Sequence, residues 1–262
     1  MRGNPVKTRL ANGETVFGTM VFEFLSPGLP TILTNAGSDF VFYDMEHSGF
    51  TWADVKMQFA LCRANGLVPL VRPPDKTYET TARLLDLGAM GLLYQMVESA
   101  EEAERLVSYT RYPPLGRRGA MFGGAHDDYS AEPVPDIIAG AHSRTMVCVL
   151  IETAAGLENV ESIMAVEGVD VAHLGHGDLS LALDVPGHYD HPVMLAGIDR
   201  ILAACATNQK PAACLAGSIE IGRAWSEQGF RMISYSYDIG LMTEALRSGI
   251  DAIRSSVNGD RT

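Results

Sequence analysis

The chain has 262 residues, of which 47% are hydrophobic and 20% are charged, and this composition excludes a disordered, collagen-like or disulfide-stapled protein. Its formal net charge of -12 at pH 7 repels phosphate backbones and anionic lipids, so we expect neither nucleic acid nor a membrane surface as a partner. Small anionic substrates are still allowed, because a local arginine or metal ion can reverse the field inside a cleft.

The four cysteines, Cys62, Cys148, Cys205 and Cys214, all lie in apolar runs and form no CxxC pair. We interpret them as small core residues in a reducing compartment. The N-terminus has no long apolar segment of the signal-peptide type, and no apolar run approaches membrane-spanning length. We therefore expect a cytoplasmic protein.

Predicted strands and helices alternate along the chain. A strand over 16–24 is followed by a helix over 29–35, a strand over 40–43 by a helix over 51–65, and a strand over 68–71 by a helix over 77–87. A strand over 91–94 precedes a helix over 99–110, which opens with a capping box from Ser99 to Glu102. After a long loop over 111–132 come a helix over 135–141, a strand over 145–151 and a helix over 156–164.

The last part of the chain continues the same alternation. A strand over 169–174 leads into a loop over 175–191 and a helix over 192–208, and strands over 211–215 and 231–235 are each followed by a helix, over 218–228 and 238–254. Eight short apolar strands, each followed by a helical segment, predict an α/β fold in which one (β/α)₈ TIM barrel spans residues 1–262. The absence of GxGxxG and GxxxxGK[ST] motifs disfavours a nucleotide-binding sheet.

Charged side chains gather where the predicted strands end. Asp44, Glu46 and His47 follow the second strand, Arg72 ends the third and Glu152 ends the fifth. The sixth strand runs into the segment from His173 to Asp178. Because barrel enzymes place their active site at the C-terminal ends of the strands, we expect these side chains to converge.

Glu152 and Asp178 follow neighbouring strands, which lie about 5 Å apart. Two carboxylates that close repel each other unless a cation or a proton lies between them. Oxygen ligands with open positions suit a hard divalent ion such as Mg²⁺ or Mn²⁺. The alternative for each residue is a carboxylate that caps the next helix.

Arg72 has a planar guanidinium suited to bidentate binding of a carboxylate, although a buried salt bridge to Asp44 or Glu46 is the alternative. Asp44 and His47 could form a carboxylate–imidazole pair that moves a proton. For Glu46 a role near the metal, a salt bridge and a charge at the helix entry are equally open.

Three further features each have a plain structural alternative. His173 and His176 could form a zinc pair, but their spacing on a strand-to-loop turn disfavours it. The loop residues His126, Asp127 and Asp128 could reach the substrate as part of a lid, or could be a solvated connection. The turn from Ala216 to Ser218 could hold a phosphate, as in a sugar-phosphate isomerase, or simply begin a helix.

Taken together, the motifs resemble the HpcH/HpaI aldolase family, the class II pyruvate aldolases. The resemblance spans about Phe17 to Asp238, and the order and spacing of the motifs carry it. They are Phe42-Tyr-Asp-Met-Glu-His47, Pro69-Leu-Val-Arg-Pro73, Leu84-Leu-Asp-Leu-Gly-Ala89, Tyr112-Pro-Pro-Leu-Gly-Arg117, Ile151-Glu-Thr153 with Glu158-Asn159, and Gly175-His-Gly-Asp-Leu-Ser180.

The resemblance implies roles for individual residues. Glu152 and Asp178 would bind a divalent metal ion, Mg²⁺, Mn²⁺ or Co²⁺, and Arg72 would hold the 2-oxo acid. His47, oriented by Asp44, would act with a metal-bound water as acid and base. The backbone N–H groups of Gly177 and Asp178 would receive the substrate carboxylate. The resemblance also implies a homohexamer, a trimer of dimers, with the C-terminal helix of about 238–254 exchanged between subunits.

The implied reaction is a reversible aldol cleavage of a 4-hydroxy-2-oxo acid to pyruvate, or hydroxypyruvate, and an aldehyde. Two positions depart from the common pattern: Leu150 stands where many members carry Gln, and Gln95, which could offer its amide to substrate, replaces a proline. The loop after Gly119 is closer to the macrophomate synthase branch. Rival hypotheses are an oxaloacetate decarboxylase with the same site, and a catalytically lapsed barrel that binds a metabolite.

Overall fold

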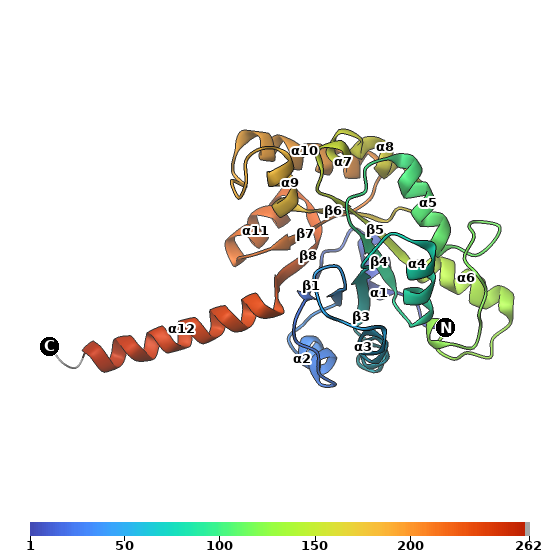
Figure 1. The fold of residues 1–262 in the computed structure, drawn as a ribbon, viewed down its shortest axis with the longest axis horizontal. Helices are drawn as coiled ribbons and strands as arrows, with labels where there is room; N and C mark the ends of the chain where they lie inside the picture. The colour runs from blue at the N-terminus through green and yellow to red at the C-terminus, as the bar shows by residue number, and fades with distance from the viewer. Residues whose placement is uncertain (260–262) are drawn as a thin grey trace.

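Eight parallel strands close into a barrel in the computed structural model, which describes residues 1–259 (Figure 1). Each strand pairs with the next one along the chain, and the last pairs with the first. The single (β/α)₈ barrel predicted from the sequence is confirmed. The strands are β1 (Val16–Val21), β2 (Phe40–Asp44), β3 (Val68–Arg72), β4 (Gly91–Tyr94), β5 (Met146–Ile151), β6 (Val171–Leu174), β7 (Ala212–Ala216) and β8 (Phe230–Tyr237).

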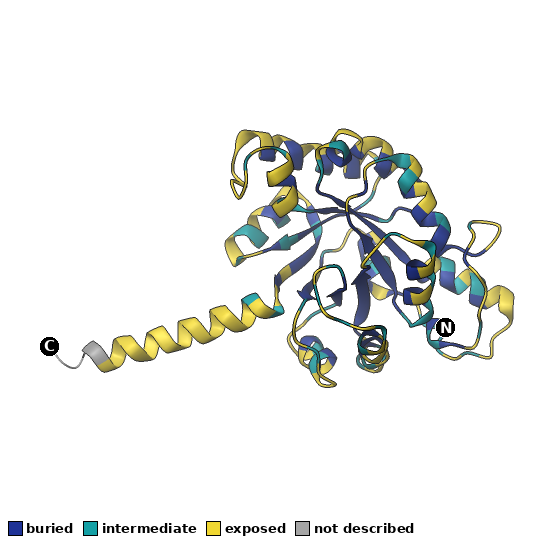
Figure 2. Cartoon of the chain, viewed as in Figure 1, coloured by how far each residue is buried: buried dark blue, intermediate teal, exposed yellow. Residues whose placement is uncertain are grey.

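Helices surround the barrel, with buried faces turned toward the strands and exposed faces toward solvent (Figure 2). They are α1 (Pro5–Ala11), α2 (Leu29–Asn35), α3 (Trp52–Asn65), α4 (Tyr78–Asp86), α5 (Ala100–Thr110), α6 (Val134–Arg144), α7 (Ala154–Glu158), α8 (Val160–Ala165), α9 (His176–Ala182), α10 (Pro192–Thr207), α11 (Ile219–Gln228) and α12 (Asp238–Gly259), with a short 3-10 turn, η1 (Ala125–Asp127).

Two apolar clusters form the core. One fills the barrel interior with inward-facing side chains such as Phe42, Leu70 and Leu150. The other lies between the strands and the helix ring, where Tyr43 and Ile163 are fully buried. Alternate residues of each strand contribute to the two clusters, and for this reason the strands are apolar on both faces. The four cysteines are free and buried, as the sequence predicts.

Several predicted elements differ from the structure. The helix α1 was not predicted, although Asn4 caps it and Pro5 occupies its first turn. The predicted loop over 175–191 contains the helix α9, which begins without a side-chain cap. The predicted helix over 156–164 is two short helices, α7 and α8, which meet at Asn159.

The first strand ends at Val21 instead of continuing to residue 24. The backbone N–H groups of Phe22, Glu23 and Phe24 donate to the carboxylate of Asp238 rather than to a neighbouring strand. This carboxylate therefore stops β1 and fixes the point at which α12 leaves the barrel.

The predicted capping box at Ser99 is only half formed. The Ser99 hydroxyl accepts a hydrogen bond from the N–H of Glu102, but the Glu102 carboxylate accepts from the N–H of Glu98 and pairs with Lys76 at 2.7 Å. The helix still begins where predicted, because one of its first N–H groups has its partner.

The last helix, α12, extends away from the barrel, and its residues from Leu241 to Val257 are exposed (Figures 1 and 2). It is amphipathic and carries charged residues among its apolar ones. Across residues 1–259, no helix has both the length and the apolar character needed to cross a bilayer.

Candidate active site

A cavity of about 230 Å³ opens at the C-terminal ends of the strands. It is lined by charged groups from three strand ends, Arg72, Glu152 and Asp178, and by apolar side chains that include Phe22, Leu150 and Leu215. The convergence of Arg72, Glu152 and Asp178 at the upper rim of the barrel is the arrangement that the sequence predicts.

Arg72 is buried at the end of β3 and is held by two carboxylates. Its Nε donates to Asp44 in a very short contact, and its Nη1 lies 3.0 Å from Oε2 of Glu46. Asp44 and Arg72 are register partners on β2 and β3, and Asp44 is fully buried. The guanidinium also lies 5.8 Å from the ring centre of Phe22. These contacts fix the direction of the guanidinium toward the cavity.

The predicted pair between the Asp44 carboxylate and the His47 imidazole does not form in the structure. Asp44 accepts a hydrogen bond from the backbone N–H of His47 at 2.6 Å, and its other oxygen accepts from Arg72. The His47 side chain is 60% exposed, and its Nε2 lies 3.6 Å from Oε2 of Glu46. Asp44 thus orients the backbone of the turn and Arg72, while the imidazole stands at the rim.

Glu152 is almost entirely buried at the end of β5, with 3% of its surface exposed. Its Oε1 accepts a hydrogen bond from the N–H of Met96 at 2.8 Å. Its side chain lies tightly against Gly175, where an added Cβ would be 2.4 Å from Cβ of Glu152 and 2.7 Å from Oε2. The absence of a side chain at Gly175 is what leaves room for this carboxylate.

Burial is the main reason that the pKa of Glu152 is raised to about 7. The nearby carboxylates of Asp178 and Glu46 raise it further, while the Met96 N–H and the Arg72 guanidinium lower it. Together with Asp44, four carboxylates therefore gather around one guanidinium. This excess of negative charge fits a site for a hard cation, which would take the Glu152 and Asp178 oxygens as ligands.

Within residues 1–259, the His, Cys, Asp and Glu side chains form no group of three or more that could hold a metal ion by themselves. A cation between Glu152 and Asp178 would therefore take two carboxylate ligands from this chain and the rest from substrate and water. Such open coordination is usual for Mg²⁺ at sites that bind oxygen-rich substrates.

Gly177 and Asp178 lie in the first turn of α9, after the N-cap Gly175. The first N–H groups of a helix have no partner inside the helix and point toward its start. Both residues line the cavity, so these N–H groups face the position predicted for the substrate carboxylate.

His173 and His176 have separate environments, which gives no support to a zinc pair. The His173 ring is buried and lies edge-on to Phe42 in the barrel interior, and burial lowers its pKa to about 3. His176 packs between Tyr189 and Trp225, at centroid distances of 4.8 and 5.4 Å. Both line the cavity as neutral groups.

Gln95 is buried beside the site but does not line the cavity in this chain. Its Nε2 donates to the carbonyl of Pro73 at 3.1 Å, and its Oε1 has no partner among the described residues. The amide therefore joins the ends of β3 and β4, and its predicted contact with substrate is not made by this arrangement.

The loop residues His126 and Asp127 are buried, and none of residues 111–132 lines the cavity of its own chain. The loop packs instead on the outer helices: Ala125 lies against Gly88, and Arg118 pairs with Asp86 at 2.7 Å. Within one chain it is a packed connection and not a lid.

Three features of the site were missed from the sequence. Met96 supplies its N–H to Glu152 from a left-handed backbone with φ of 46°, Phe22 packs on Arg72, and Gly175 gives room to Glu152. Only Gly175 had a usable signal, because a glycine directly after a buried strand often marks a close approach.

The chain is similar to known proteins over most of its length. The family model described as HpcH/HpaI aldolase/citrate lyase matches residues 20–245. A protein of Salmonella schwarzengrund named 2-keto-3-deoxy-L-rhamnonate aldolase is 32% identical, over 96% of this chain and 94% of its own.

Two solved structures share the whole fold. An HpcH/HpaI aldolase/citrate lyase family protein from Burkholderia cenocepacia is 30% identical with a TM-score of 0.90, over 96% of this chain and 100% of its own. An HpcH/HpaI aldolase from Desulfitobacterium hafniense is 27% identical with a TM-score of 0.90, over 95% of this chain and 96% of its own.

Proposed function

Because the chain belongs to the HpcH/HpaI aldolase/citrate lyase family, it is a carbon–carbon lyase of the aldolase type, and we propose that it works with a divalent metal ion held by Glu152 and Asp178. One observation carries this proposal: the buried Glu152 and the neighbouring Asp178 share a cavity with the guanidinium of Arg72. When bound there, a divalent cation would polarise the 2-oxo group of the substrate.

The side chains of this protein would bind and orient the substrate. Arg72 donates to the 2-oxo acid, since Asp44 and Glu46 hold its guanidinium in one direction. The N–H groups of Gly177 and Asp178 receive the carboxylate of a 4-hydroxy-2-oxo acid at the start of α9. The apolar wall formed by Leu150 and Leu215 keeps water from the reacting carbons.

Bond cleavage then needs a base at the 4-hydroxyl group and a place for the electron pair. We assign the base to His47, the exposed imidazole at the rim. As the proton leaves the 4-hydroxyl, the C3–C4 bond breaks, an aldehyde forms at C4 and the electron pair moves to the 2-oxo oxygen beside Arg72. Protonation at C3 gives pyruvate, or hydroxypyruvate when C3 carries a hydroxyl.

A Schiff-base route has little support from the lysines. The chain has four of them, Lys7, Lys56, Lys76 and Lys210, and none lines the cavity within residues 1–259. Without an amine at the carbonyl, the electron pair must be stabilised by positive charge.

The test is metal removal. Pyruvate release from a 4-hydroxy-2-oxo acid is followed with lactate dehydrogenase and NADH. Treatment with EDTA should abolish it, and Mg²⁺, Mn²⁺ or Co²⁺ should restore it. Full activity of the metal-stripped protein would refute the proposal.

For the substrate we propose a 2-keto-3-deoxy sugar acid, the class named for the Salmonella relative. Its 4-hydroxy-2-oxo acid end matches the groups assigned above. A panel of such acids with different chain lengths and stereochemistry would test this, and cleavage of none of them would contradict it.

Decarboxylation of oxaloacetate is the second candidate, and the position of His47 favours it. The imidazole is 60% exposed and is not held by Asp44, while loss of CO₂ requires no base at a 4-hydroxyl. His47→Ala should abolish aldol cleavage and leave oxaloacetate decarboxylation largely intact. If both activities fall together, His47 serves the site in another way.

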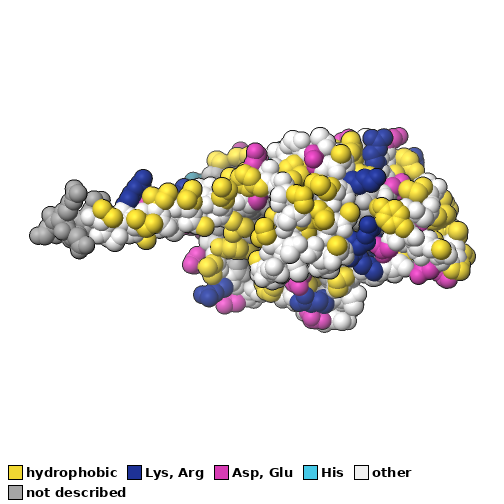
Figure 3. Space-filling view, turned by 90° about the horizontal axis from the view of Figure 1, so that it is seen from below, with side chains coloured by type: hydrophobic (Ala, Val, Ile, Leu, Met, Phe, Trp, Pro, Cys, Tyr) yellow, Lys and Arg dark blue, Asp and Glu magenta, His cyan; other side chains and the backbone are white. Residues whose placement is uncertain are grey.

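We also propose that α12 is exchanged with a neighbouring subunit in a homohexamer. Apolar side chains lie along the projecting helix (Figure 3). The exposed ones recur at three- and four-residue spacing: Ile239, Met242, Leu246, Ile250, Ile253 and Val257. Leu246→Glu should reduce the mass measured by light scattering, and Ser255→Glu, an exposed change on the same helix, should not. An unchanged mass for Leu246→Glu would contradict the exchange.

A further inference from the structure

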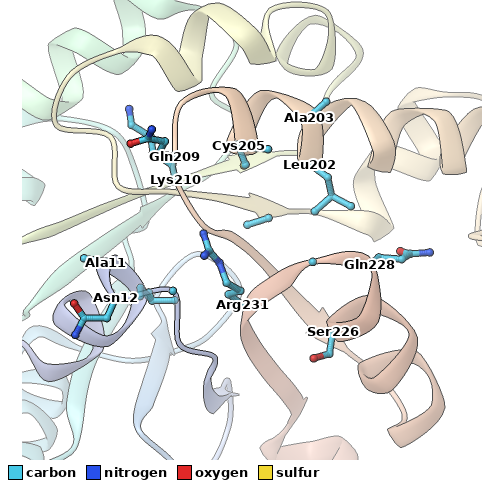
Figure 4. A pocket seen from close by; sticks show the side chains of 15 residues that line it. Ala11, Asn12, Leu202, Ala203, Cys205, Gln209, Lys210, Ser226, Gln228 and Arg231 are labelled. Atoms are coloured by element: carbon cyan, nitrogen blue, oxygen red, sulfur yellow. The ribbon is translucent and has the colours of Figure 1, made fainter.

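A second cavity lies at the opposite end of the barrel from Glu152. It measures about 980 Å³, is open to solvent, and is lined by residues from the ends of α1, α10 and α11 and from the starts of β7 and β8 (Figure 4). Arg231 stands in its middle, between Asn12 on one side and the segment Gln209–Lys210 on the other.

Arg231 is directed into this cavity by an irregularity of β8. Ala212 pairs with Phe230 and Ala213 pairs with Met232, so Arg231 is an extra residue in the strand, a β-bulge. Bulges at barrel rims turn a side chain out of the regular alternation. The guanidinium lies against the turn after α1, where a Cβ at Gly13 would be 3.6 Å from its Nη1.

Arg231 is partly exposed, and within residues 1–259 its guanidinium takes part in no side-chain hydrogen bond or salt bridge. The chain has 32 acidic and 20 basic residues, yet none of the described residues that line this cavity is acidic. The carbonyl ends of α1, α10 and α11 make a cation tolerable here. These carbonyl groups accept no hydrogen bond from Arg231, so the five N–H donors of its guanidinium are open to the cavity.

Two other residues of the cavity lining, Lys210 and Gln209, also carry donors. Lys210 gives two of its N–H bonds to the carbonyls of Met164 and Val166, at 2.6 and 2.7 Å, and keeps a third. Gln209 has a left-handed backbone, with φ of 56°, at the end of α10. Glycine is the usual residue at that position, and a glutamine there costs about 1 kcal/mol of the free energy of unfolding. Its side-chain amide lines the cavity.

We propose that this cavity is a second binding site, for a small molecule with a phosphate or carboxylate group, which Arg231 holds with help from Gln209 and Lys210. The planar guanidinium of Arg231 is not paired with a carboxylate of the protein, and two of its N–H groups can bind two oxygens of a phosphate or carboxylate group. The site is independent of the aldolase assignment, because it shares no residue with the catalytic cavity.

Isothermal titration of inorganic phosphate, and separately of succinate, into the Mg²⁺-loaded full-length protein at constant ionic strength tests the proposal. We expect saturable binding of at least one anion, weakened about tenfold or more in Arg231→Met, which loses a charge-assisted contact. Arg247→Met removes an equal charge from the exposed face of α12 and should bind as the wild type does. Asp178→Asn, an active-site variant expected to melt like the wild type, should also retain binding, which separates this cavity from the active site.

Gln209→Gly tests whether weaker binding can occur without a loss of stability. Glycine suits the left-handed backbone, so this variant should melt at the same or a higher temperature while binding the anion more weakly. The proposal is overturned if neither anion binds the wild type saturably or if Arg231→Met binds as tightly as the wild type. It is also overturned if binding is lost only in Asp178→Asn.

Discussion

Replacement of Gly175 by alanine tests how Glu152 is positioned. The new Cβ would lie 2.4 Å from Cβ of Glu152, 2.7 Å from its Oε2 and 3.3 Å from Cγ of Leu150. Gly175 has φ of -90°, which alanine adopts without strain, so any effect comes from this overlap. Because the closest atom is next to the backbone, Glu152 cannot avoid it by a rotation of its tip. Overpacking of this kind costs about 1–3 kcal/mol of the free energy of unfolding.

The same displacement should weaken metal binding, since a divalent cation accepts its oxygen ligands only within a narrow distance range. For Gly175→Ala we expect the calorimetric dissociation constant of Mg²⁺ to rise about tenfold or more, with a matching loss of kcat/KM. Gly177→Ala is the control, because a Cβ there meets nothing within 4 Å and the N–H is kept. If Gly175→Ala binds Mg²⁺ and turns over like the wild type, the proposed position of the ligand is wrong.

Three other changes have expected outcomes. Arg72→Met leaves the buried Asp44 without its cation and should lower the free energy of unfolding in urea by about 3–5 kcal/mol; an unchanged midpoint would contradict the pairing. In the folded protein His173 stays neutral down to about pH 3, whereas in the unfolded chain it binds a proton below its ordinary pKa of about 6.5. Because only the unfolded chain gains this proton, the free energy of unfolding decreases as the pH falls from 6.5 toward 3. His173→Phe should remove about 2 kcal/mol of the fall in stability between pH 7 and 5, and an equal fall in both proteins would refute this. Met96→Gly relieves a left-handed backbone and keeps the N–H to Glu152, so Mg²⁺ affinity should hold while the melting temperature stays or rises; weaker Mg²⁺ binding would contradict this arrangement.

The barrel was predictable because its strands are short and apolar on both faces, and because helix caps mark most boundaries. Thr51 caps α3 with a complete capping box, as its position before the helix suggests. The helix α9 was missed since it has no side-chain cap and contains Gly177; its burial of Leu179 against the core stabilises it instead. For α1 the sequence does contain a capping signal, Asn4 followed by Pro5.

The groups that face the cavity follow from strand ends, whereas their pairing follows only in part: a salt bridge from Arg72 to Asp44 or Glu46 was the alternative role for Arg72, and the structure forms both. Spacing along the chain suggested that Asp44 holds His47, three residues away. In the structure Asp44 lies in register with Arg72 on the adjacent strand, and the guanidinium takes its carboxylate. A contact across two strands depends on register, which a single sequence does not contain. For the same reason, the contact between Glu152 and the N–H of Met96 could not be predicted from the sequence.

The most direct measurement is the binding of Mg²⁺ to the wild type and to Glu152→Gln and Asp178→Asn by calorimetry, with pyruvate present. We predict one bound cation per chain in the wild type and about a hundredfold loss of affinity in each variant, with melting temperatures that remain close to that of the wild type. Undiminished Mg²⁺ binding by both variants would show that the cation, and with it the chemistry proposed here, lies elsewhere.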